Sequence, residues 1–147
     1  DVAYEFKDKL GCILWQLPGN LHRNDEKLEA FCDLLLKDVD NCIEFRHDSW
    51  LDDQVYKILE KHKTGFCVVS SPDKDLKKIK STADFSYFRF HGERGRKWYD
   101  YDYSDDELKV WAKEINNTGK ETVYVYFNND MNAHAPANAQ KLVEILD

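Results

Sequence analysis

Three short segments of this sequence alternate apolar and polar side chains where a buried strand is expected to be apolar throughout. They are residues 43–47 (IEFRH), 87–91 (YFRFH) and 123–128 (VYVYFN). A period of two is typical of a β-strand, in which successive side chains point to opposite faces of the sheet. Helical patterns separate the segments, so the strands are expected to be parallel and covered on both faces. A polar face inside such a sheet must be paired, hydrated or functional, because an unpaired buried charge costs several kcal/mol.

The polar face of these segments is therefore the strongest indication of a functional site. Its members share their parity within a strand and are Glu44, Arg46, Tyr87, Arg89, His91, Tyr124, Tyr126 and Asn128. The opposite face is apolar, as expected of the side that packs against helices, and carries Ile43, Phe45, Phe88, Phe90, Val123, Val125 and Phe127.

The whole sequence alternates strand patterns with helix patterns. Strands are predicted at residues 12–17, 42–47, 66–70, 86–91 and 122–128. Helices are predicted from Asn24 or Asp25 to 35, over 53–61, from a capping box at 104–107 to 115, and from Pro136 to 146. Residues 1–9 have the pattern of the tail of an earlier helix, and residues 73–80 predict a poor helix or a loop.

Two architectures fit this order of elements: an open doubly wound sheet, or part of a (β/α)₈ barrel. The polar face favours the barrel, because catalytic groups stand inside a barrel at the carboxyl ends of its strands, whereas helices cover both faces of an open sheet. Five strands do not close an eight-stranded barrel. We therefore expect residues 1–147 to be the carboxyl-terminal portion of a single TIM-type barrel domain in a longer protein.

Composition narrows the possible partners and the compartment. The formal net charge of −7 argues against a general binder of nucleic acid or anionic membranes. No apolar run approaches the roughly 20 residues of a membrane span, and the start does not have the pattern of a signal peptide. The cysteines lack zinc-type spacing and lie in apolar patterns, which predicts buried, reduced thiols in a soluble, cytoplasmic protein. They are Cys12, Cys32, Cys42 and Cys67.

Four motifs occur in order along the chain: residues 10–18 (LGCILWQLP), 43–50 (IEFRHDSW), 82–92 (TADFSYFRFHG) and 124–130 (YVYFNND), followed by Ala137-Asn138-Ala139. Together they resemble the YecE-like family, a domain of unknown function, over essentially the whole chain. The resemblance implies a TIM-type barrel of which this chain supplies strands four to eight. It implies no established reaction, so function has to be argued from the site.

The candidate site combines acid–base groups with anion-binding groups. We expect Glu44 and His91 to transfer protons, and Arg46 and Arg89 to bind a carboxylate or phosphate. The substrate would further contact Gln16, Tyr126, Asn128 and Asn129. An alternative for Glu44 with Arg89 is an ion pair that fills the interior and fixes the strand register.

Weaker candidates lie around this site. His47 has the opposite parity to Glu44, and Asp48 and Trp50 follow it in a loop. The end of the last strand at 128–130, with the loop at 92–97, suggests a phosphate subsite. Residues 99–103 would form a lid or an edge strand. A metal held by Glu44, His91 and Asp130 is possible but not favoured, and no cofactor is identified.

These observations predict a barrel enzyme with hydrolase-like acid–base chemistry on a small anionic or polyhydroxylated substrate. The alternative is a non-catalytic barrel that binds a metabolite or a nucleic-acid end, although nucleic acid is not favoured. No membrane partner is expected.

The first and last predicted strands would each have an unpaired backbone edge in this chain. Such edges template pairing with another chain unless charge, proline or a covering segment prevents it. We expect the 147-residue chain to self-associate, which light scattering across a dilution series would detect. A monomer at every concentration would contradict this prediction.

Overall fold

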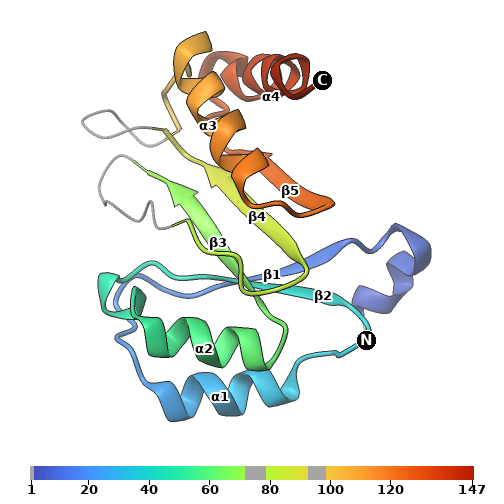
Figure 1. Ribbon diagram of the computed structural model, residues 1–147, viewed down its shortest axis with the longest axis vertical. Coiled ribbons are helices and arrows are strands. Elements are labelled where there is room, and N and C mark those ends of the chain that lie inside the picture. The colour runs from blue at the N-terminus through green and yellow to red at the C-terminus, as the bar shows by residue number, and fades with distance from the viewer. Residues whose placement is uncertain (1, 72–78, 93–98) are drawn as a thin grey trace.

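The computed structural model describes residues 2–71, 79–92 and 99–147, which form five parallel strands with helices between them (Figure 1). The strands are β1 (Cys12–Gln16), β2 (Asp40–Glu44), β3 (Gly65–Ser70), β4 (Phe85–Phe90) and β5 (Thr122–Phe127). The α-helices are α1 (Asp25–Leu34), α2 (Asp53–Lys61), α3 (Asp105–Asn117) and α4 (His134–Leu146). Short 3₁₀ helices are η1 (Val2–Lys9), η2 (Asp48–Trp50) and η3 (Met131–Ala133).

The strands lie in the sheet in their order along the chain, β1-β2-β3-β4-β5, and every neighbouring pair is parallel. A doubly wound open sheet reverses its strand order at a switch point, so this sequential order excludes that alternative. The sheet is curled, with α1 and α2 beside its first strands and α3 and α4 beside its last (Figure 1). The architecture is an α/β half-barrel.

The helix starts follow from local sequence, either from a side chain that caps the first backbone N–H groups or from a first turn that can accommodate a proline. Asn24 accepts a hydrogen bond from the Lys27 backbone at 2.9 Å, and Ser104 with Glu107 forms the predicted capping box. The last helix begins at His134, two residues before the predicted Pro136. A proline is tolerated anywhere in the first turn, because the first backbone N–H groups have no partner within the helix.

The two faces of the curled sheet carry different side chains, as the period of two predicts. The outer face packs against the helices and includes Ile43, Phe45, Phe66, Val68, Phe88 and Phe90. A smaller apolar cluster on the inner face consists of Cys42, Cys67, Val69, Ala83, Phe85 and Tyr87, with Cys12, Leu14, Leu51 and Tyr124 against it. The four cysteines are free thiols, three of them buried.

Some predicted boundaries differ from the structure. The second strand ends at Glu44 rather than at residue 47, because His47 caps η2 by accepting from the Ser49 backbone. Residues 2–9 form a 3₁₀ helix. Residues 99–103 form no strand; Tyr103 is buried and its ring packs on Phe90. Residues 72–78 lie outside the described residues, and they include most of the segment at 73–80 for which the sequence predicts a poor helix or a loop.

No helix among the described residues is both long and apolar enough to cross a membrane.

The start of β3 requires a glycine. A Cβ atom added at Gly65 would lie 2.7 Å from Cε2 of Phe85 and 2.8 Å from Cζ, and the Phe85 ring is buried. We expect Gly65→Ala to lower the free energy of unfolding by about 1–3 kcal/mol through overpacking. Urea denaturation would measure the change. In the control Gly19→Ala the nearest atoms lie at 3.8 Å, an ordinary contact, so its stability should stay close to that of the wild type.

Candidate functional site

A buried ion-pair network lies at the carboxyl ends of the strands, on the inner face of the sheet. Glu44 is the last residue of β2 and is fully buried. Its Oε2 accepts from Nη1 of Arg89 in β4 at 2.6 Å, and its Oε1 pairs with Nε of Arg46. The structure thus brings together the carboxylate and the two guanidinium groups that the sequence placed on one face.

Two amide side chains extend this network to the outermost strands. Oε1 of Gln16, at the end of β1, accepts from Arg89 at 2.9 Å and from Arg46 at 3.1 Å. Oδ1 of Asn128, directly after β5, accepts from Nε of Arg89 at 3.0 Å. Arg89 therefore links residues from β1, β2 and the end of β5.

His91 lies beside the two arginines and is buried. Its Nε2 is 3.4 Å from Nη2 of Arg46. A guanidinium group donates and cannot accept, so this contact requires an unprotonated Nε2 and places the proton of the neutral ring on Nδ1. Burial, together with the positive charges of Arg89 and Arg46, lowers the pKa of His91 to about 3. The imidazole is therefore neutral at physiological pH.

The balance of charge in the network suits an anion. Two guanidinium groups face one carboxylate and a neutral imidazole, which leaves a net charge of about +1. The Glu44 side chain has no exposed surface, whereas the side chains of Arg46 and Arg89 keep 17% and 15% of theirs. A ligand would therefore reach the arginine side chains and not the carboxylate.

The two other predicted substrate contacts lie in different surroundings. Tyr126 is on the inner face of β5, 47% exposed, and its ring stacks on that of Tyr87. Asn129 is buried, and its Nδ2 donates to the Tyr101 carbonyl and to Oδ1 of Asn138 in α4, both at 2.7 Å. These contacts join the end of β5 to α4, so Asn129 is not part of the Glu44 network.

The weaker candidates also lie outside the network. The His47 ring packs against His22 and pairs with Asp48, and the buried Trp50 donates to the Leu21 carbonyl. Within the described ranges, no group of three histidine, cysteine or acidic side chains is placed to hold a metal ion, so Glu44, His91 and Asp130 do not form such a group. Most of the loop at 92–97 lies outside the described residues.

Two inner-face residues outside the predicted site support the network: Cys67, which the sequence pattern indicated only as a buried thiol, and Tyr87, which the pattern placed on the polar face without a role. Cys67 in β3 is buried, and its Sγ lies 3.8 Å from Oε2 of Glu44. Burial raises the pKa of this thiol, which keeps it a neutral donor. Tyr87 supports the ring of Tyr126. Parity along β4 placed Tyr87 on the inner face, and parity along β3 would have placed Cys67 there, but parity does not show which side chains touch.

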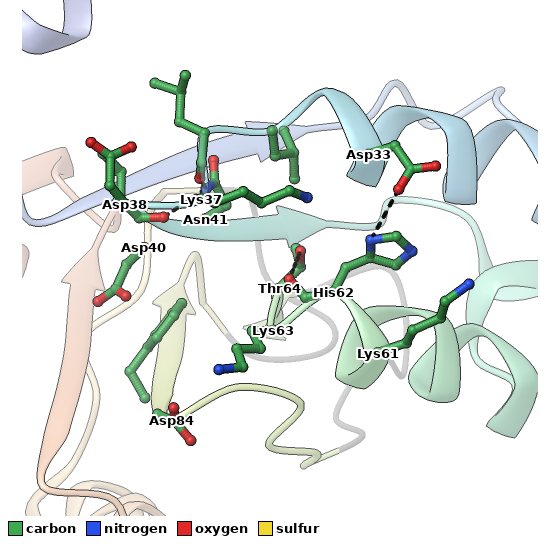
Figure 2. A pocket seen from close by; sticks show the side chains of 14 residues that line it. Asp33, Lys37, Asp38, Asp40, Asn41, Lys61, His62, Lys63, Thr64 and Asp84 are labelled. Atoms are coloured by element: carbon green, nitrogen blue, oxygen red, sulfur yellow. Dashed lines mark hydrogen bonds and ion pairs between the residues drawn. The ribbon is translucent and has the colours of Figure 1, made fainter.

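A cleft of about 650 Å³ lies at the opposite end of the strands (Figure 2). Its lining includes Asp40 at the start of β2, Thr64 before β3 and Phe85 at the start of β4. An interaction between His62 and Asp33, 3.6 Å apart, lies at one side of it. The Glu44 network is at the carboxyl ends, where α/β barrels hold their reacting groups, so we assign the candidate site there and not to this cleft.

Comparisons with known proteins agree with this architecture. The sequence model of the family described as "Protein of unknown function DUF72" matches residues 1–147, which confirms the predicted family. UPF0759 protein YunF of Bacillus subtilis (strain 168) is 25% identical over 172 residues, covering 99% of this chain and 61% of YunF.

Two solved structures of DUF72 family proteins are also similar. The one from Thermotoga maritima MSB8 has 29% identity and a TM-score of 0.82, covering 94% of this chain and 58% of that one. The one from Enterococcus faecalis V583 has 21% identity and a TM-score of 0.82, covering 95% of this chain and 59% of that one. At this identity the similarity shows the fold alone. The chain therefore spans about three fifths of the length of these relatives.

The low pKa of His91 predicts a dependence of stability on acid. The unfolded chain protonates this imidazole below a pH of about 6.5, whereas the folded chain does so only near 3. Folding stability should be fully present above pH 6.5 and should fall by about 3–5 kcal/mol as the pH drops toward 3. Urea denaturation between pH 4.5 and 7 would measure the slope.

His91→Gln is the matched variant, because its amide oxygen can accept from Arg46 without titrating. The free energy of unfolding of this variant should fall less steeply with decreasing pH than that of the wild type. Equal slopes would show that His91 does not cause the loss.

Proposed function

We propose that this chain, which belongs to the DUF72 family of proteins of unknown function, carries the anion-binding and proton-transfer part of a barrel enzyme. The reaction would be hydrolase-like acid–base chemistry on a small anionic or polyhydroxylated substrate. The chain would contribute strands four to eight of a TIM-type barrel in a cytoplasmic protein. Its four free cysteines and the absence of a membrane-spanning helix among the described residues are compatible with that compartment.

One observation carries this proposal: two arginines, oriented by a buried carboxylate, lie beside a neutral histidine at the carboxyl ends of parallel strands. Arginine binds carboxylate and phosphate groups through paired N–H donors. Because Glu44 and Gln16 hold both guanidinium groups, little side-chain freedom would be lost when an anion binds. This preorganisation supports a role of Arg46 and Arg89 in substrate binding.

His91 is the better candidate for proton transfer. It is neutral near pH 7, and Nε2 can accept a proton once its contact with Arg46 is broken, although its low pKa makes it a weak base in the absence of ligand. An anion bound between Arg46 and Arg89 would offset their charge and raise the pKa of His91. Proton acceptance would thus be coupled to substrate binding.

Glu44 would act mainly by positioning the arginines. Both of its oxygens are paired and its side chain is buried, so a substrate would not reach it directly. A role of Glu44 in proton transfer would require the ion pairs to rearrange. Gln16 and Asn128 would orient Arg89, and through it the substrate.

The same burial of Glu44 favours a second candidate, a barrel that binds a metabolite without turnover. In that case the carboxylate would fix the arginines permanently, and His91 would serve as a hydrogen-bonding group. The net charge of −7 makes nucleic acid the less favoured ligand.

We expect Arg89→Ala to weaken the binding of inorganic phosphate at least tenfold, since one of the two guanidinium groups that would bind the anion is lost. Isothermal titration at constant ionic strength would measure the affinity. Arg23→Ala is the control, because Arg23 pairs with Asp25 and Asp52 rather than with Glu44, and its loss removes the same charge. It should leave phosphate binding unchanged.

If Arg89 serves structure alone, its removal would leave Glu44 partly unpaired, lowering stability by roughly 3–5 kcal/mol without changing phosphate affinity. Turnover separates the two candidate functions. An enzyme should hydrolyse members of a panel of nitrophenyl phosphates and glycosides and lose this activity with His91→Gln. Binding of phosphate without turnover of the panel would favour the binding barrel.

A further inference from the structure

Three tyrosines line the inner face of the sheet next to the arginine network. Tyr87 in β4 and Tyr126 in β5 stack with their ring centroids 5.2 Å apart and their planes 20° apart. Tyr124 lies beside Tyr87 at 5.8 Å and meets the edge of Phe85. These rings form a continuous aromatic row along β4 and β5, which ends at Tyr126 on the side of the network.

Exposure differs along this row. Tyr87 is 5% exposed, whereas Tyr126 is 47% exposed. One face of the Tyr126 ring rests on Tyr87, so its exposed surface includes the opposite face. A tyrosine held from behind in this way presents a planar, amphipathic surface with little conformational freedom to lose.

The exposed ring is next to Arg46 and Arg89, which form the proposed anion clamp. Arg89 and Tyr126 are direct partners in the parallel register of β4 and β5, and both side chains lie on the inner face. The next inner-face residue after Tyr126 is Asn128, which accepts from Nε of Arg89. Side chains on neighbouring strands start about 5 Å apart, so one small ligand can touch both the guanidinium group and the ring.

We propose that Tyr126, supported by Tyr87, is a ring-binding subsite for a substrate whose phosphate or carboxylate group is bound by Arg46 and Arg89. The substrate class is then an anionic group attached directly, or through one or two bonds, to an aromatic or sugar ring. The ring stacks on the exposed face of Tyr126 while the anion faces the guanidinium groups. The inference rests on the proposed function, which supplies the anion clamp.

Three probes test this proposal by titration of the complete barrel protein, to which this chain would contribute strands four to eight: inorganic phosphate, propyl phosphate and phenyl phosphate. The two organic phosphates both carry an apolar group, but only phenyl phosphate has a ring. We expect phenyl phosphate to bind about threefold to tenfold more tightly than propyl phosphate, as expected for an added aromatic contact. Tyr126→Leu should abolish this preference and leave inorganic phosphate unaffected.

Two further variants keep the result interpretable. Tyr126→Phe retains the ring and should retain the preference, which separates stacking from any contribution of the hydroxyl. Phe6→Leu is the matched control, because it removes an exposed aromatic ring in η1, away from the site. Melting curves of all variants would verify that the fold is retained.

Equal affinity for the two organic phosphates, or a preference that persists in Tyr126→Leu, would overturn the ring subsite. Inorganic phosphate distinguishes this failure from failure of the proposed function. If inorganic phosphate binds and depends on Arg89 while no ring preference exists, the ring subsite alone is wrong. If inorganic phosphate does not bind, the anion clamp is wrong and the ring subsite falls with it.

Discussion

The pairing of one buried carboxylate with two guanidinium groups organises the inner face of this half-barrel. Glu44 is fully buried, and a buried charge of this kind is tolerated only when it is paired. One partner, Arg46, follows β2 by two residues, and the other, Arg89, lies in β4. The ion pairs therefore connect β2 with β4, which are not neighbours in the sheet. Gln16 then attaches the first strand to both arginines, and Asn128 attaches the end of the last strand to Arg89.

This network depends on the curl of the sheet. Strands β1 and β4 are three positions apart, which in a flat sheet would separate them by about 14 Å, too far for side chains that stand perpendicular to the sheet to meet. Arg89 nevertheless donates to Gln16 at 2.9 Å. On the intervening β3, the inner-face residues Cys67 and Val69 are short and leave room for Arg89 to cross to Glu44. The curl that shapes a barrel thus also assembles the candidate site.

The same contacts relate stability to function. An ion pair that only filled the interior would need no solvent-facing surface, but both arginine side chains keep some exposure while the Glu44 side chain keeps none. His91 is held neutral next to them by burial and by their charge. In the proposed function, the stabilising role belongs to Glu44 and the ligand-facing role to the arginines, so one network serves both.

The sequence by itself determined the order of strands and helices along the chain, the helix caps and the face on which each strand residue lies, because period-two alternation and capping chemistry are local properties of the chain. Parity alone placed Glu44, Arg89, His91 and Tyr126 on one face. Only the tertiary structure decided which of these side chains touch, that Asn129 joins α4 instead, and that Cys67 lies beneath Glu44. Those contacts depend on how strongly the sheet curls and on which strands become neighbours. Both are set by packing between residues far apart in the sequence, which no local pattern encodes.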